Sequence, residues 1–599
     1  MLTLADRIHS ARTKLTNFLV SKQEVPSWVL IELSGSISEF PQANPLARIP
    51  FAGRLPLGLS RNPQSISELR RIFVQLSADD RIQGVVLQIR CIASPSHFQS
   101  MRTIIANFRN AGKRVVAYAN NFGPFGYYLA CACDKIVMPP AAEWTVLGLG
   151  NEYVFLKDAL ETVGISAEVV NVSPFKSAGD QFSRNDFSDQ SRAQAEWLLD
   201  AQYSELIRGI SLARGLEENS VRALIDKAPY GASQAVANGL IDETKYEDEL
   251  GTWLAPQEHK TPDGDQRPLR LFGRSVLPAA LRQRKSADTN ESSWIGRWSE
   301  VRRTLAVPVE YFAKPVLGVI SIEGAITEGQ SQTLPVPLPF VGSRTAGCDS
   351  VNQVIRVAER NPQIGAVVVY VNSPGGSALA SDLIAREIDR LAHKKPVFVY
   401  MGGVAASGGY YVAAFGRKIV AQPLTITGSI GVILTKPNIA GLLEKGRLHV
   451  TTLNRGERSD AFGVNRAFSA DERAAAVALI QRAYSEFKGV VAKGRKIDAD
   501  KLEDICGGRV WTGAQALSHN LVDEVGDFTV VQKLAHDALG IHPEYTLRTM
   551  MVQGSRHSIL PTAWPLAARM LSDPGSLFRE IRRSIRTMMV LPFVQGEVD

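Results

Sequence analysis

One serine in a turn of small residues has the surroundings that a nucleophile needs. Ser407 lies in GVAASGGYY at 403–411, just before an apolar run with helical character. A serine in such a turn can present its Oγ at the N-terminus of the following helix, among unpaired backbone N–H groups. The expected chemistry is acyl transfer, in which the Oγ attacks a carbonyl carbon.

A glycine turn upstream of this serine could hold the carbonyl oxygen of the same substrate. NSPGGSA at 372–378 directly follows a predicted strand, and its two glycines allow a backbone that exposes its N–H groups to an anion. A related part of the chain has ASPSHFQ at 93–99, without either glycine, and NNFGPFGYY at 120–128, with Pro124 nearest the serine position. That part cannot supply the hydroxyl.

The candidate base shows the opposite asymmetry. SPFKSAGD at 173–180 contains Lys176, whereas the related RGERSDAF at 455–462 places Arg458 opposite it. Arginine stays protonated and cannot act as a general base, but a desolvated lysine can. One part has kept a serine and a glycine turn, and the other has kept a lysine. This complementary loss predicts one site that combines Ser407 with Lys176.

The sequence gives little support for a catalytic histidine or for a metal site built from cysteines. None of the nine histidines lies in a Gly/Ser turn of the copy that contains Ser407, and His97 lies where the other copy lacks the glycines. A Ser-His-Asp triad therefore stays open without local support. Cys131 and Cys133 form a C-x-C with no second pair, so no metal site is expected. The five cysteines are interpreted as buried, reduced thiols.

The two related parts belong to an internal duplication. VLIELSGSI at 29–37 recurs as GVISIEGAI at 318–326, and ASQAVANGLIDE at 232–243 recurs as GAQALSHNLVDE at 513–524. Within each copy, short Val/Ile-rich runs alternate with longer amphipathic segments, which predicts an α/β fold with largely parallel sheets flanked by helices.

The predicted organisation is an amphipathic N-terminal segment (1–25), an N-terminal domain that supplies the lysine (26–255), a connector (256–315), a C-terminal domain that supplies the serine and the oxyanion hole (316–545), and a basic amphipathic tail (546–599).

Composition and charge exclude several classes of protein. The 599 residues are 45% hydrophobic, which is too apolar for a disordered chain. The net charge of +7 comes without a dense Lys/Arg block, so no nucleic-acid partner is expected. No apolar run reaches about 18 residues and the N-terminus lacks a secretory h-region, so neither a transmembrane helix nor a signal peptide is expected.

Both ends of the chain have basic, amphipathic patterns. Residues 4–19 place five apolar side chains on one helical face: Leu4, Ile8, Ala11, Leu15 and Leu19. Near the other end, a second predicted helix has six apolar members: Leu577, Phe578, Ile581, Ile585, Met588 and Met589. Such helices can lie on anionic membranes or pack against the protein itself. The expected localisation is therefore membrane-associated, as a peripheral protein, or soluble.

In this order, the motifs resemble those of one enzyme family. NSPGGSA, ASGGYY, TGSIGV at 427–432 and GRVWTGAQAL at 508–517 make the chain similar to the long, tandem form of the signal peptide peptidase A family, also called protease IV. The resemblance implies two tandem ClpP/crotonase-like domains and a serine endopeptidase with a Ser/Lys dyad. On that basis Ser407 matches the nucleophile and Lys176 the general base.

The resemblance also implies the rest of the site and its partners. Gly376 matches the oxyanion-hole position, the Gly408 N–H is the expected second donor, and Ser429 matches a serine that hydrogen-bonds the lysine. The implied enzyme needs no metal or organic cofactor, degrades cleaved signal peptides and other short apolar peptides, and forms a ring-like homotetramer. Long bacterial members usually begin with a membrane-spanning helix, which this sequence does not show.

Two other functions stay open at this point. An acyl-CoA hydratase or isomerase would use the glycine N–H groups to hold a thioester enolate, but it usually needs a carboxylate near the oxyanion turn, and NSPGGSA offers none. A non-catalytic scaffold would use the duplication only to build a ring. Retention of Ser407, Gly376 and Lys176 in complementary copies argues against the scaffold.

Overall fold

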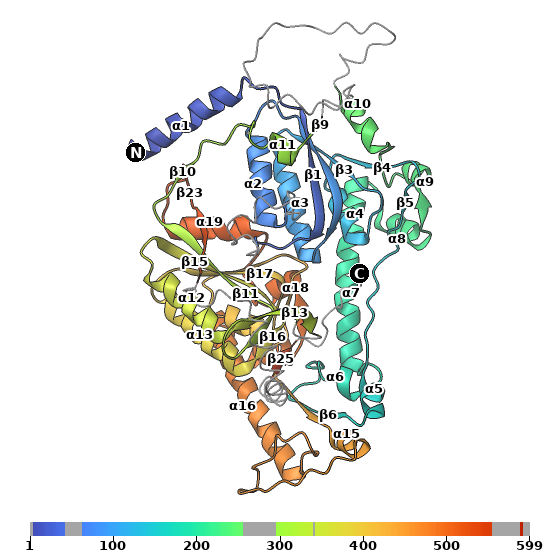
Figure 1. Cartoon of the computed structure of the whole chain (residues 1–599), viewed down its shortest axis with the longest axis vertical. Helices are drawn as coiled ribbons and strands as arrows, with labels where there is room; N and C mark the ends of the chain where they lie inside the picture. Colours follow the sequence, from blue (N-terminus) through green and yellow to red (C-terminus); the bar gives the residue numbers. More distant parts are fainter. Residues whose placement is uncertain (1–3, 42–62, 256–294, 339–341, 554–587, 591–599) are drawn as a thin grey trace. The chain divides into compact units, whose positions relative to one another are not determined.

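The computed structural model describes residues 4–41, 63–255, 295–338, 342–553 and 588–590 (Figure 1). They form two compact units. The first comprises residues 1–93, 101–148 and 206–309, and the second comprises 94–100, 149–205 and 310–599. Segment 149–205 comes from the first copy of the duplication but packs within the second unit.

The first unit is built on a six-stranded sheet in the order β8-β4-β3-β2-β1-β9, in which every neighbouring pair is parallel. The buried runs of β1 and β2 are the Val/Ile-rich segments, as expected for strands covered on both faces. The strands of this unit are β1 (Trp28–Ser36), β2 (Gly84–Ile92), β3 (Arg114–Tyr118), β4 (Lys135–Met138), β8 (Glu243–Thr244), β9 (Ile295–Arg297) and the separate pair β5 (Glu143–Trp144) and β7 (Tyr230–Gly231).

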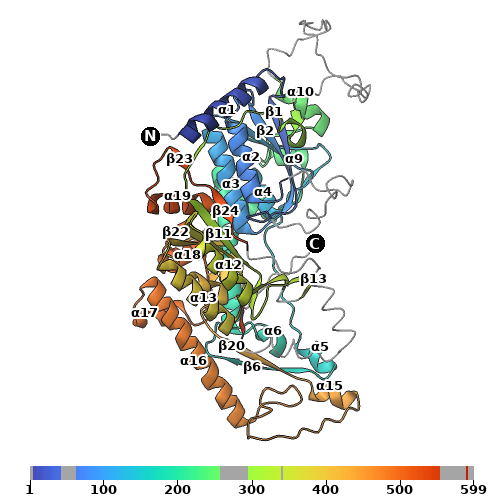
Figure 2. The same cartoon turned by 60° about the vertical axis from the view of Figure 1, so that its left-hand side comes forward.

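Helices cover this first sheet. Ser65 caps helix α2, because its side chain accepts a hydrogen bond from the Glu68 N–H, and Figures 1 and 2 show α2 beside α3 against the strands. The helices that lie wholly or partly in this unit are α1 (Leu4–Val20), α2 (Ile66–Ser77), α3 (Pro95–Asn110), α4 (Pro124–Ala130), α7 (Asp189–Arg214), α8 (Glu218–Asp226), α9 (Ala232–Ala237), α10 (Leu250–Leu254) and α11 (Trp298–Val301).

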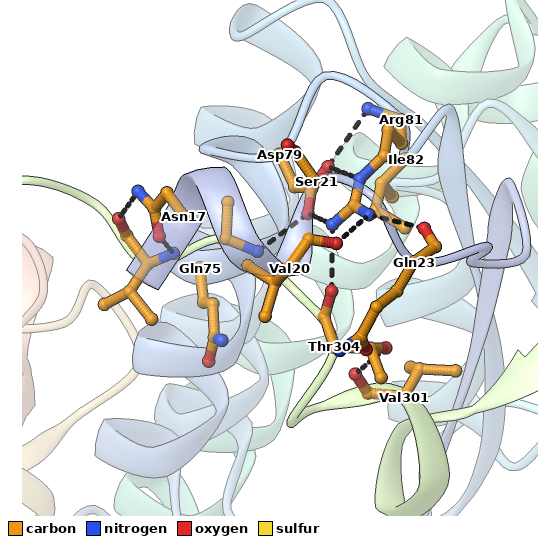
Figure 3. A network of polar contacts seen from close by, with 12 residues as sticks. Asn17, Val20, Ser21, Gln23, Gln75, Asp79, Arg81, Ile82, Val301 and Thr304 are labelled. Carbon is orange, nitrogen blue, oxygen red and sulfur yellow. Dashed lines mark hydrogen bonds and ion pairs between the residues drawn. The ribbon is translucent and has the colours of Figure 1, made fainter. Parts of the chain in front are cut away.

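A network around Arg81 fastens the end of helix α1 to the first unit (Figure 3). Asp79 accepts hydrogen bonds from the Arg81 guanidinium, which also donates to the carbonyl oxygens of Val20, Gln23 and Thr304. Asn17 exchanges two hydrogen bonds with the backbone of Val307, at 2.8 and 3.0 Å. Helix α1 is therefore held by polar contacts on one side.

The second unit repeats the strand order of the first. Its parallel series β22-β18-β17-β15-β11-β24 corresponds strand for strand to β8-β4-β3-β2-β1-β9, which is what a duplicated domain should show. The strands of this sheet are β11 (Val316–Glu323), β15 (Ile364–Ser373), β17 (Val397–Ala406), β18 (Ile419–Ala421), β22 (Glu524–Val525), β24 (Thr549–Met551), β19 (Ile426–Gly428) and β21 (Val510–Thr512).

A second sheet of this unit has the order β13-β14-β12-β16-β25-β20-β6 and places short segments beside the chemistry-bearing motifs. Its strands are β13 (Thr333–Leu338), β14 (Gly342–Gly347), β12 (Ala325–Thr327), β16 (Gly375–Ser377), β25 (Met588–Val590), β20 (Ile433–Asn438) and β6 (Ser166–Asn171). A separate parallel pair joins β10 (Tyr311–Phe312) to β23 (Tyr545–Thr546).

Helices also cover the main sheet of the second unit, and its core is a large cluster of buried aliphatic side chains. Both views show α12 and α13 together on one side of the strands, with α19 on the other (Figures 1 and 2). The remaining helices wholly in this unit are α5 (Lys157–Thr162), α6 (Asp180–Ser183), α12 (Cys348–Arg360), α13 (Ala378–Ala392), α14 (Gly408–Ala413), α15 (Ala440–Lys445), α16 (Ala470–Arg495), α17 (Ala499–Ile505), α18 (Gly513–Ser518) and α19 (Phe528–Ala538).

The prediction of an α/β fold with largely parallel sheets flanked by helices is confirmed. The predicted C-terminal helix is wrong at Met588 and Met589, which belong to strand β25 because backbone partners on β16 and β20 pair with them. The rest of that predicted helix, residues 577–587, lies outside the described residues. Within the described residues, no helix combines the length and apolar character needed to cross a membrane.

Candidate active site

Ser407 lies at a sharp turn between strand β17 and helix α14. Its φ is 56° and its ψ is −120°, a conformation that is rare for a residue with a side chain and costs about 1–3 kcal/mol. Two backbone hydrogen bonds hold it there, from the Ser407 N–H to the Gly428 oxygen and from the Tyr411 N–H to the Ser407 oxygen, at 2.8 and 2.9 Å. The predicted turn before a helix is present, with strand β17 ending at Ala406 on its other side, and Ser407 is fully buried.

Lys176 brings its amine directly to this serine. Its Nζ lies 2.7 Å from the Ser407 Oγ and donates to the Ser429 carbonyl oxygen and Oγ, both at 2.9 Å. The side chain is completely buried, and none of these three partners is a carboxylate. Burial disfavours the ammonium form and holds the pKa of Lys176 well below its ordinary value. A neutral amine beside a hydroxyl can take its proton.

Two glycines make room for the lysine side chain. A β-carbon at Gly508 would lie 2.5 Å from the Lys176 backbone nitrogen, and one at Gly431 would lie 3.3 Å from the Lys176 Cδ. Gly508 belongs to GRVWTGAQAL and Gly431 to TGSIGV, so both motifs line the path of the lysine. Sequence reasoning used these motifs for the resemblance but missed this role.

Ser429 is positioned by an unusual backbone as well. Its φ is 52°, and its N–H donates to the Arg509 carbonyl oxygen at 2.6 Å. The residue is fully buried, and both of its oxygens face the Lys176 amine. The structure therefore places Ser429 where the resemblance implies a serine that hydrogen-bonds the lysine.

Gly376 and Gly408 lie next to each other, as two donors to one oxygen must. Gly376 is in strand β16 with φ of 152°, and a β-carbon there would lie 2.0 Å from the Ile326 carbonyl oxygen. A β-carbon at Gly408 would lie 2.4 Å from the Ser381 Oγ and 3.2 Å from the Gly376 nitrogen. Gly376 therefore requires glycine, a side chain at Gly408 would displace the Ser381 Oγ, and the two backbones approach closely beside Ser407.

Ser373 supports the glycine turn and was missed at the sequence level. Its Oγ donates to the Gly324 carbonyl oxygen at 2.6 Å and accepts from the Gly375 N–H at 3.1 Å. These bonds fix the backbone immediately before Gly376. The signal for this role was present, because Ser94-Pro95 of the first copy matches Ser373-Pro374.

The other candidates lie elsewhere. Arg458 is exposed and forms an ion pair with Asp471 at 2.8 Å, unlike the buried Lys176. His97 is buried with its Nε2 3.5 Å from the Tyr370 Oη, and burial lowers its pKa to about 4. Among the described residues, the Ser407 Oγ has Lys176 as a hydrogen-bond partner and no histidine.

Metal-ligating side chains do not gather at one point in the described part of the chain. No group of three or more His, Cys, Asp or Glu side chains in that part could hold a metal ion. All five cysteines are free thiols; Cys131, Cys348 and Cys506 are buried, whereas Cys91 and Cys133 are partly exposed.

Comparison with known families identifies two matching regions. The profile of Peptidase family S49 matches residues 107–260 and again 389–542. Lys176 lies in the first match, and Ser407, Gly408 and Ser429 lie in the second, whereas Gly376 precedes it. The predicted tandem organisation of one family's domains is thereby confirmed.

Individual relatives are similar over most of the chain. "Serine protease SPPA, chloroplastic" from Arabidopsis thaliana is 34% identical over 88% of this chain and 72% of its own length. "Protease 4" of Haemophilus influenzae is 29% identical over 78% of this chain and 72% of its own length. Among solved structures, a ClpP1 mutant from Listeria monocytogenes has 15% identity and a TM-score of 0.22, covering 35% of this chain and 91% of that chain. The protease names of the sequence relatives favour peptide hydrolysis over the acyl-CoA and scaffold alternatives.

Proposed function

The chain belongs to peptidase family S49 and is a serine peptidase, and from this premise we propose that Ser407 and Lys176 form its catalytic dyad. The observation that carries the proposal is the 2.7 Å contact between the Lys176 Nζ and the Ser407 Oγ in a fully buried setting. The base comes from the first copy of the duplication and the nucleophile from the second, so each copy supplies what the other has lost.

The neutral amine fits its three contacts. Its two N–H groups are directed to the two oxygens of Ser429, which leaves the nitrogen lone pair for the Ser407 hydroxyl hydrogen. Lys176 then takes the Ser407 proton as the Oγ attacks a peptide carbonyl, and it returns that proton to the leaving amine. Water hydrolyses the acyl-enzyme by the same steps.

The adjacent N–H groups of Gly376 and Gly408 hold the oxyanion in this mechanism. Removal of one such donor in other hydrolases costs about 3–4 kcal/mol of transition-state stabilisation. Their mutual approach beside Ser407 supports this assignment.

The substrates we propose are cleaved signal peptides and other short apolar peptides, and the proposed assembly is a homotetramer.

The test is hydrolysis of a fluorogenic apolar peptide by wild type and single variants. Ser407→Ala and Lys176→Ala should each lower kcat by about 100-fold or more, as expected for loss of a nucleophile or a general base. Lys436→Ala is the matched control, because Lys436 is also buried, burial also lowers its pKa, and its Nζ donates to the Ala461 oxygen. Near-full activity of Lys176→Ala would place the base elsewhere.

We also propose that helix α1 makes peripheral contact with an anionic membrane. Its side chains Leu15, Phe18 and Leu19 are 57–60% exposed, whereas Ser10 and Val20 are buried. The apolar side of the helix thus faces away from the unit that holds it. From His9 to Lys22 the sequence contains three Lys/Arg residues and no Asp or Glu, which suits an anionic lipid surface.

Vesicle flotation tests this contact. The triple variant Leu15→Ser, Phe18→Ser, Leu19→Ser should lose most binding to vesicles that contain phosphatidylglycerol, while Leu212→Ser should bind as wild type does. Leu212 is a suitable control because it is a highly exposed leucine, at 75%, on helix α7. Equal flotation of the triple variant and wild type would exclude α1 as the contact.

A further inference from the structure

A short loop after helix α17 lies against the lysine of the proposed dyad. A β-carbon at Gly508 would lie 2.5 Å from the Lys176 backbone nitrogen and 2.8 Å from the Lys176 Cβ, so a side chain has no room between the loop and the lysine. Gly507 and Gly508 have φ of 64° and 80°, a conformation that favours glycine. The backbone of the loop therefore covers Lys176 on this side.

The same loop holds the segment that orients the lysine amine. The Gly508 N–H donates to the Ile430 carbonyl oxygen at 2.9 Å, and the Ser429 N–H donates to the Arg509 carbonyl oxygen at 2.6 Å. Two backbone hydrogen bonds thus tie consecutive residues of the loop to consecutive residues of TGSIGV. A movement of the loop would displace the two Ser429 oxygens that contact the amine.

Two further contacts join the loop to the segment that carries the lysine. The Arg509 guanidinium lies over the ring of Phe175, 4.8 Å from its centroid, and Phe175 directly precedes Lys176. The Val510 N–H donates to the Gln194 Oε1 of helix α7 at 2.9 Å. All of these residues belong to the second unit. The loop 507–510 therefore contacts both the lysine segment and the serine segment, and its position affects how they meet.

Tyr484 on helix α16 supports this loop through a buried hydrogen bond. Its Oη accepts from the Gly507 N–H at 2.8 Å and donates to the Glu503 Oε1 at 3.1 Å. Tyr484 is only 7% exposed, and its bond to Gly507 satisfies a buried N–H. Lys488 forms an ion pair with the same carboxylate at 2.9 Å. Figure 2 shows α17, which precedes the loop, beside α16.

We propose that Tyr484 is a positioning residue for Lys176, because its hydroxyl fixes the loop 507–510 that covers the lysine and holds Ser429. The inference rests on the proposed function, since it requires Lys176 to be the base. Tyr484 acts through Gly507 and Gly508 and takes no part in the proton transfer itself. Its contribution is to keep water away from the amine and to keep the amine in place.

Loss of the Tyr484 hydroxyl should change the pH dependence of the reaction. The Gly507 N–H would lose its partner, and the loop could move away from Lys176. Burial lowers the pKa of Lys176, so admission of water would raise that pKa toward its ordinary value. A higher pKa means that the neutral amine forms only at higher pH. The acidic limb of activity should therefore move to higher pH.

The other titratable groups around the loop do not explain such a shift. Burial raises the pKa of the Cys506 thiol to about 12. Burial also raises the pKa of Glu503, but hydrogen bonds from Lys488 and Tyr484 lower it more, so it lies below the ordinary 4.5 overall. The pKa of Tyr484 lies above 10, chiefly because the side chain is buried. Neither Cys506, Glu503 nor Tyr484 changes its charge between about pH 5 and pH 10.

Tyr484→Phe tests the role with the ring retained. In an assay of kcat/KM for a fluorogenic apolar peptide, its acidic limb should lie higher by at least about 0.5 pH unit. Its kcat/KM at the optimum should fall about fivefold, the factor expected for loss of one hydrogen bond. Tyr127→Phe is the matched control, because Tyr127 is fully buried in the first unit and its Oη donates to the Leu240 carbonyl oxygen. This control should lower the Tm but leave the limb where it is in wild type. A limb at the wild-type pH in Tyr484→Phe would show that Tyr484 is only structural.

Hydrogen exchange measures the loop independently of activity. The Gly507 amide should exchange about fivefold faster in Tyr484→Phe than in wild type, and at the wild-type rate in Tyr127→Phe. Equal exchange in all three proteins would overturn the claim that Tyr484 holds the loop. If Lys176→Ala is inactive but Tyr484→Phe keeps the wild-type pH profile, this inference fails alone. If Lys176→Ala is as active as wild type, the proposed function fails with it.

Discussion

Replacement of Ser429 by alanine separates the positioning of the lysine from the chemistry that it performs. The change removes one 2.9 Å hydrogen bond from the Lys176 amine and leaves its contacts with the Ser429 carbonyl oxygen and the Ser407 Oγ. One such bond contributes about 1 kcal/mol. Since 1.36 kcal/mol corresponds to a tenfold change in rate, kcat/KM at the pH optimum should fall about fivefold.

The same substitution should move the acidic limb of the pH profile. In the proposed mechanism activity requires the neutral amine, so kcat/KM should rise with pH through the pKa of Lys176. Burial already places that pKa well below its ordinary value. The lost hydroxyl stabilises an ammonium more than an amine, because hydrogen bonds from charged donors are stronger. Its removal disfavours the charged form further, and the limb moves to lower pH.

The assay is kcat/KM for a fluorogenic peptide between pH 5 and pH 10, with thermal unfolding measured alongside. Ser100→Ala is the control, since Ser100 is buried in the same unit and its Oγ contacts Tyr400 and Gln422 at 3.3 and 2.9 Å. Ser100→Ala should leave the acidic limb at the same pH and should keep kcat/KM at the pH optimum within about twofold of wild type. Two results for Ser429→Ala would refute the proposed role of Ser429 as a positioning partner of Lys176. One is an acidic limb that moves to higher pH, and the other is an unchanged pH profile with an unchanged kcat/KM at the optimum.

Two further substitutions probe the backbone of the site and the anchor of α1. Gly376→Ala should lower kcat by about 100-fold or more, because the added β-carbon would overlap the Ile326 carbonyl oxygen. Gly329→Ala is the control, since Gly329 also has a positive φ but no heavy atom lies near the position of its β-carbon. This variant should stay active in the same peptide assay. Asp79→Asn should lower the Tm at pH 7. Burial raises the pKa of the Asp79 carboxyl, but hydrogen bonds from the Arg81 side chain and from backbone N–H groups lower it more, so its pKa in the folded protein lies below the ordinary 3.8. The carboxylate therefore stabilises the folded protein above about pH 3.8, and this stabilisation is lost on acidification. The Tm difference between wild type and variant should therefore shrink below about pH 4, and a constant difference would contradict this account.

Much of the fold and of the candidate site can be predicted from the sequence because duplicated motifs carry local information. Val/Ile-rich runs predict the strands of both copies. The presence of Ser407 in one copy and Lys176 in the other predicts a shared site, and the structure brings them to 2.7 Å across 231 residues of chain. These inferences need only residue types and a comparison of the copies.

What could not be predicted depends on contacts between distant segments. Nothing in residues 149–205 indicates that they pack with the second copy rather than with their own. Met588 and Met589 have helical spacing with Ile585, yet two strand edges far away in the sequence pair with them as a strand. A short segment adopts the conformation for which tertiary partners exist, and its own pattern does not reveal them.

The placement of segment 149–205 has a consequence for when the enzyme becomes active during its synthesis. Lys176 leaves the ribosome 231 residues before Ser407, a delay of roughly 10–50 s at about 5–20 residues per second. Until then the nascent chain holds the proposed base without the proposed nucleophile, and its lysine segment lacks strands β20 and β17 of the same unit. If Ser407 and Lys176 are the dyad, as proposed above, the chain cannot hydrolyse a peptide bond before Ser407 has been made. Under the proposed dyad, a chain that loses either copy by recombination should lose its peptidase activity.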